Sequence, residues 1–166
     1  MSDALVKEIL NELRETFSAA GLAASVEDID GSDVLSIEYS EESAFEDGSI
    51  LITHYDDIIT VFIIITIWSG LEESRKEDMK SFLPYFNRFL TIGNFRVDDE
   101  DDTLEMRYSF IADDSTERTK LMKMIIAAYG ASAAAAIDAA VTTAPVITGE
   151  KKASELLNED ALIIQF

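Results

Sequence analysis

The chain has 166 residues, of which 13 are Lys or Arg and 33 are Asp or Glu, so its formal net charge is −20. Hydrophobic residues make up 48% of it, which excludes an acidic disordered tail and predicts roughly one domain around one core. Because this charge repels phosphate groups, we expect no nucleic acid and no anionic membrane among the partners.

The N-terminal part of the chain is predicted to form one helix and a set of short strands. Apolar residues recur on one side of the first segment, and Gly21 follows as a helix stop. An Asp-Gly pair then favours a tight hairpin between two strands. The predicted elements are a helix at Asp3–Ala20, strands at Ser25–Asp30 and Asp33–Tyr39, an acidic loop at Ser40–Gly48 and at most a short strand at Ile50–Thr53.

The run Ile58–Trp68 is the most informative segment of the sequence. Its 11 apolar and β-branched residues are too few for a membrane helix and favour a long central strand. One side of this strand is purely aliphatic and is expected to lie under helices. The other side is mixed and carries Phe62, Ile64 and Trp68. We expect Ser36 and Glu38 to flank this mixed side on a neighbouring strand. The mixed side is either covered by the C-terminal tail or by a second copy of the chain, or it is offered to a partner.

The next segment is predicted to be a helix followed by a hairpin with an acidic tip. The helix, Glu72–Ile92, contains Pro84, which predicts a kink or a second helix starting near Ser81. The hairpin strands are expected at Asn94–Asp98 and Thr103–Phe110. In the predicted register three pairs face each other: Val97 with Leu104, Phe95 with Met106, and Arg96 with Glu105.

The C-terminal part is predicted to contain a long alanine-rich helix and an extension. The helix is expected at Thr116–Thr143 and ends before Pro145. Gly130 within it marks either close packing or a division of the helix. Its small residues, Ala127–Ala140, fit either the core or a subunit interface. The extension is predicted to hold a short helix at Glu150–Asn158 and an apolar tip at Ala161–Phe166.

This order predicts an α+β fold, α-β-β-β-α-β-β-α, with an antiparallel sheet and helices packed on one face. We expect residues 1–144 to form a single domain and residues 145–166 to be a C-terminal extension. The first residues lack a basic region followed by an apolar one, so a cytoplasmic location is expected.

Residues 86–98 and 104–108 resemble the YbjN-like group, which is similar in fold to the type III secretion chaperones. In that group a helix carrying an Asn leads into a Gly-Asn-Phe turn and then into an acidic-tipped hairpin with an Arg-Tyr pair. The matching residues are Asn87, Gly93, Asn94, Phe95, Arg107 and Tyr108. The resemblance implies a small dimeric protein without catalytic residues that holds other polypeptides, as a chaperone or a regulator.

The sequence indicates no catalytic, cofactor or metal site. The chain has no Cys, which excludes disulfides, thiolate nucleophiles and the usual structural zinc sites. His54 is the only histidine, and we expect it to be a surface or turn residue. The acidic run Asp98–Asp102 has Thr103 and Ser109 where a calcium loop needs Gly and Glu, so a solvated hairpin tip is expected.

We therefore expect a non-catalytic, acidic, polypeptide-binding protein that forms a homodimer and favours basic or amphipathic partners. The residues expected to bind are Phe62, Ile64, Trp68 and Arg107. One alternative is a small-ligand sensor with a pocket between sheet and helices, lined by Phe82, Phe86 and Tyr108. Another is a cofactorless enzyme that uses carboxylates and His54.

Overall fold

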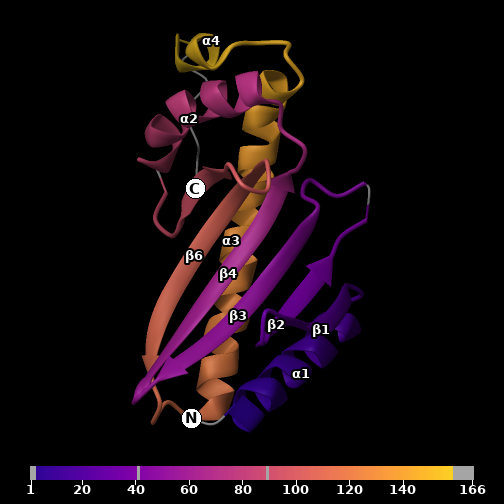
Figure 1. The fold of residues 1–166 in the computed structure, drawn as a ribbon, viewed down its shortest axis with the longest axis vertical. Coiled ribbons are helices and arrows are strands. Elements are labelled where there is room, and N and C mark those ends of the chain that lie inside the picture. The colour runs from indigo at the N-terminus through magenta and orange to yellow at the C-terminus, as the bar shows by residue number, and fades with distance from the viewer. Residues whose placement is uncertain (1–2, 41, 89, 159–166) are drawn as a thin grey trace.

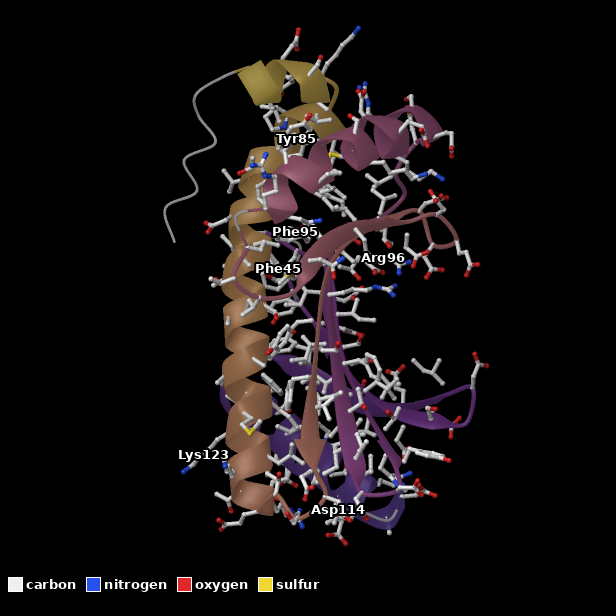
Figure 2. The ribbon with its side chains drawn as sticks, turned by 90° about the vertical axis from the view of Figure 1, so that its left-hand side faces the viewer. Phe45, Tyr85, Phe95, Arg96, Asp114 and Lys123 are labelled. Carbon is white, nitrogen blue, oxygen red and sulfur yellow. The ribbon has the colours of Figure 1, made fainter. Side chains whose placement is uncertain are left out.

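Six strands form one antiparallel sheet in the order β1-β2-β3-β4-β6-β5, and the helices pack on one of its faces (Figures 1 and 2). This computed structural model describes residues 3–40, 42–88 and 90–158. The bounds are α1 Asp3–Ala19, β1 Ala23–Ile29, β2 Ser32–Glu38, β3 Asp47–Tyr55, β4 Ile58–Trp68, α2 Glu73–Asn87, β5 Asn94–Asp98, β6 Thr103–Asp113, α3 Arg118–Ile147 and α4 Ala153–Asn158. The predicted α+β class with helices on one face is confirmed.

The sheet contains one more full strand than the predicted order allows. β3 has nine residues and pairs with β2 on one side and β4 on the other. Its first residues, Asp47 and Gly48, were expected in a loop because the stretch Ser40–Gly48 is polar and acidic. Gly48 is needed there because the hydroxyl of Tyr129, from α3, lies 2.1 Å from where a Cβ would stand.

The central strand β4 has the predicted extended form and the predicted difference between its two sides. It lies between β3 and β6. Its aliphatic side faces α3 and is buried, with relative exposures between 0 and 2% for Ile59, Val61, Ile63, Ile65 and Ile67. Burying five such side chains stabilises the fold by roughly 1.5–3 kcal/mol each. β4 therefore forms the centre of the core.

Neither proline has the effect that was predicted from the sequence, namely a break in the helix at Pro84 and the end of the long helix before Pro145. α2 runs through Pro84 without a break but ends at Asn87, earlier than expected. α3 continues two residues past Pro145, because a proline in the last turn removes only one backbone hydrogen bond. Gly130 lies on the exposed side of α3, where a Cβ would meet no atom within 4 Å, so it neither allows close packing nor divides the helix.

α3 is also the one helix among the described residues that is long and apolar enough to cross a membrane. In this fold it lies along the sheet, where it contacts β4 and β6 (Figure 2). Ile125, Ala136 and Ala139 are buried against that face. Its apolar composition is thus partly explained by the core.

The extension after α3 is anchored at its start. α4 contacts α2, and Ala153 and Leu156 are buried there. α4 begins three residues later than predicted. The predicted apolar tip, Ala161–Phe166, lies outside the described residues.

Candidate functional site

The face of the sheet opposite the helices carries exposed apolar side chains. On β4 these are Ile58, 49% exposed, and Phe62, 38% exposed. Ile111 of β6 and Tyr55 of β3 add exposures of 70% and 79%. Figure 2 shows α3 on one side of the sheet and none of the described helices over the middle of the other side. We call this surface, centred on Phe62, the open face.

A serine lies beside each of the two central β4 residues of the open face, Phe62 and Ile64. Phe62 lies opposite Ser109 of β6, and Ile64 lies opposite Ser49 of β3 and Arg107 of β6. A hollow of about 450 Å³ is lined by Phe62, Ile64 and Ser109 together with the first residue of β5, Asn94. Three of the four residues expected to bind, namely Phe62, Ile64 and Arg107, thus line one hollow.

Arg107 is held in place by two carboxylates of the β5–β6 hairpin. Its guanidinium donates to Glu105 Oε2 at 2.5 Å and to Asp98 Oδ2 at 2.9 Å, and both carboxylates are nearly buried. Arg96 also pairs with Asp98. The backbone N–H of Glu100, followed by the charges of Arg96 and Arg107, holds the pKa of Asp98 below its usual value. Arg107 is therefore a fixed wall of the hollow.

Trp68, the fourth expected residue, does not join this group. A bulge between Thr66 and Trp68 changes the register, so Trp68 lies opposite Leu104, a core residue. It lines a separate hollow of about 290 Å³ with Phe45 and Tyr39, and its Nε1 has no hydrogen-bond partner within the described part of the chain. The alternation that placed Trp68 beside Phe62 holds only for an unbroken strand.

The expected flank of the open face is also one strand further away than predicted. Ser36 and Glu38 lie on β2, opposite Ser49 and Asp47 of β3, and it is β3 that borders β4. The predicted order left β3 out, which is why the two strands were expected to be neighbours.

The Asp and Glu residues are the only fully charged residues of β1, β2 and β3, whereas β5 and β6 add Arg96 and Arg107. From Ala23 to Trp68 the chain has 11 acidic residues and no Lys or Arg. Burial, together with the nearby charges of Glu46 and Glu105, raises the pKa of Asp47, although a hydrogen bond from Thr66 partly opposes the shift. The apolar centre is therefore set in a negative field.

The residues of the resemblance motif form the joint between α2 and the hairpin. The Asn87 side chain donates to the Phe95 carbonyl at 2.9 Å and accepts from the Phe95 N–H at 2.8 Å. Gly93 has φ +61°, and a Cβ there would lie 2.5 Å from the Arg107 carbonyl oxygen. The motif thus has a structural role and also defines one end of the hollow.

The acidic hairpin tip is bound to α2, which the sequence did not reveal. Lys80 lies 2.7 Å from Asp99, and Lys76 lies 2.7 Å from Asp102. The hydrogen bond to Asp102 raises the pKa of Lys76. Among the described residues no group of three or more His, Cys, Asp or Glu side chains could hold a metal ion. The only sequence pattern that could have predicted the contact between the hairpin tip and α2 is two lysines one helical turn apart, Lys76 and Lys80, which is a common pattern.

The residues expected to form a sensor pocket or an active site around His54 are engaged in packing and in a side-chain contact. Phe86 packs on Phe82 and on Phe95, with ring centroids 5.8 and 5.0 Å apart, so aromatic rings surround two of the residues expected to line a sensor pocket. The third, Tyr108, lies on β6 opposite Ile63, with its ring centroid 6.1 Å from that of Phe110. His54 lies in β3 rather than in a turn. Its Nε2 is 3.0 Å from Asp3 at the start of α1.

Comparison with known proteins gives a likeness of fold and nothing more specific. No family model matches the sequence, and no curated protein matches it. Among solved structures, YbjN from E. coli, described as a candidate transcription regulator, matches with a TM-score of 0.46 and 13% identity. The match covers 78% of this chain and 90% of that chain. YbjN belongs to the group that residues 86–98 and 104–108 of this chain resemble.

Proposed function

We propose that this chain is a non-catalytic, cytoplasmic, polypeptide-binding module, acting as a chaperone or a regulator, and that the open face is its binding surface. The observation that carries the proposal is the exposure of Phe62, Ile58 and Ile111 on a sheet face without a helix over it. Exposed apolar patches with polar surroundings mark interaction sites. The acidic strands around the patch favour a basic or amphipathic polypeptide.

We also propose that the protein forms a homodimer. The outer side of α3 offers Ile137, 46% exposed, and Val141, 71% exposed, for contact with a second copy. This surface belongs to the other layer of the molecule, so dimerisation through it leaves the open face accessible.

Replacing Phe62 by Ala should weaken the binding of an unfolded basic polypeptide by about tenfold or more, because central aromatic residues dominate binding energy. The affinity is measured by fluorescence anisotropy with a labelled polypeptide. Tyr85→Ala is the matched control, since Tyr85 is 49% exposed on α2, away from the open face (Figure 2). An equal loss in both variants, or no loss in Phe62→Ala, would contradict the proposal.

A further inference from the structure

We infer that an extended segment of the partner polypeptide binds as an added strand on the outer edge of β6, antiparallel to Tyr108–Asp113 and in line with β5. The inference rests on the proposed function and specifies how and where the partner binds. This partner segment carries a basic residue, then an apolar residue, then a second apolar residue, at alternate positions counted from the N-terminus of the segment.

The first observation is that half of β6 has an unpaired outer edge. β5 pairs with Thr103–Arg107 only. The next six residues, Tyr108–Asp113, pair with β4 on their inner side, and no described strand pairs with their outer side. In Figure 1 this half of β6 forms the border of the sheet. Native proteins usually shield such edges, because the free N–H and C=O groups accept another strand.

The second observation explains why the position beside this edge is vacant. β5 begins at Asn94, directly after Gly93, whose positive φ turns the chain away from the line of the strand. The close approach of Gly93 to the Arg107 carbonyl fixes that turn. An added strand would therefore occupy the place in the sheet that a longer β5 would have filled.

The third observation is that the hollow of the open face lies at this vacant position. Its lining includes Asn94 at the start of β5, Ser109 on the unpaired part of β6, and Phe62 behind Ser109. Because the Ser109 side chain is small, an apolar side chain opposite it on an added strand can reach the Phe62 ring across it. The hollow thus fits one apolar residue of the partner.

The remaining side chains of β6 on the same face specify the other partner residues. Side chains alternate, so Ser109, Ile111 and Asp113 all point to the open face. Ile111, 70% exposed, fits a second apolar residue. Asp113 lies at the end of the strand beside the Asp56–Asp57 turn, and it fits Lys or Arg. In an antiparallel partner the residue opposite Asp113 comes first, which sets the order basic, apolar, apolar.

The first half of the sheet contributes no cation near Asp113. No Lys or Arg lies between Ala23 and Trp68. The nearest cation along the chain after β6, Arg118, is paired with Glu8 at 3.0 Å and Glu12 at 2.7 Å. A basic residue of the partner therefore meets the carboxylate of Asp113, which also accepts a hydrogen bond from the Ser115 N–H at 2.8 Å.

The test uses the full chain and a synthetic peptide with Lys, Leu and Leu at three alternate positions and Thr elsewhere. Hydrogen exchange should show that the peptide slows exchange of amides within Tyr108–Asp113. The same peptide N-methylated at the two amides that face β6 should bind about tenfold or more weakly, because it keeps the side chains but loses two backbone hydrogen bonds. Replacing its Lys by Asp should also weaken binding, and more so at low salt.

Two protein variants form a matched pair for the same measurement. Ile111→Lys should weaken binding about tenfold, because a lysine on an edge opposes strand addition. Ile29→Lys changes the same residue type at 48% exposure on β1, the opposite edge of the sheet, and should leave binding unchanged.

Equal binding of the N-methylated peptide, or protection confined to other segments, would overturn the inference. The failure of the edge mode is distinguishable from that of the proposed function by Phe62→Ala. If N-methylation has no effect but Phe62→Ala still abolishes binding, the open face binds side chains without strand addition. If neither change affects binding, the proposed function fails as well.

Discussion

Replacing Gly93 by Ala should destabilise the protein by about 3 kcal/mol, because the substitution combines backbone strain with a collision. The φ of +61° costs an L-residue on the order of 1 kcal/mol. The new Cβ would also stand 2.5 Å from the Arg107 carbonyl oxygen and 2.6 Å from Met106 Cε. The Arg107 oxygen belongs to the backbone of β6, so either the hairpin or the joint with α2 must move.

Gly70→Ala is the control for Gly93→Ala. Gly70 has a nearly identical φ of +66°, but a Cβ there meets nothing within 4 Å, so only the strain of about 1 kcal/mol is expected. Urea denaturation of both variants measures the difference. Equal losses would show that the close approach of Gly93 to β6 has no energetic importance.

Replacing Arg107 by Met should cost about 2–3 kcal/mol at neutral pH, because it leaves two nearly buried carboxylates without their shared cation. The side chains of Asp98 and Glu105 are only 11% and 7% exposed. Arg118→Met is the matched control, since Arg118 also pairs with two carboxylates, but these are 63% and 50% exposed. The control should lose less than about 1 kcal/mol.

The cost of Arg107→Met should shrink in acid. The pKa of Asp98 is lower in the folded protein than in the unfolded chain, so its ionisation adds stability above the unfolded pKa. That contribution is lost as the pH falls through the folded pKa, in the window below about pH 4. Denaturation curves near neutral pH and near pH 3 should therefore show a smaller gap between the variant and the native protein in acid. A gap independent of pH would mean that Arg107 stabilises by packing alone.

Local alternation was sufficient to predict the parts of the fold that are regular. The register of the β5–β6 hairpin agrees with all three predicted pairs, Phe95–Met106, Arg96–Glu105 and Val97–Leu104. The same alternation identified the buried and open sides of β4. In the hairpin, and in β4 up to Thr66, the pairing is regular, so the side on which each side chain lies follows from the parity of its position.

The features that sequence reasoning missed depend on residues far apart in the chain. β3 begins at Asp47 and contains Gly48 because Tyr129, 81 positions later, occupies the space of a Cβ. Trp68 leaves the open face because of a bulge, and no residue type marks that bulge in the sequence. The unpaired edge of β6 arises because β5 is six residues shorter than β6, which becomes visible only in the pairing.

One side of β4 is buried, and we propose that its other side is open to a partner. Because the chain has no Cys, Phe62→Cys and Ile63→Cys each place a single thiol on one side of the strand. Thiol labelling of the full chain should be on the order of 100-fold faster at position 62, since a buried thiol reacts only after local opening. Bound basic polypeptide should slow labelling at position 62. Equal slow labelling at both positions without a partner would contradict the claim, because the face would then already be covered.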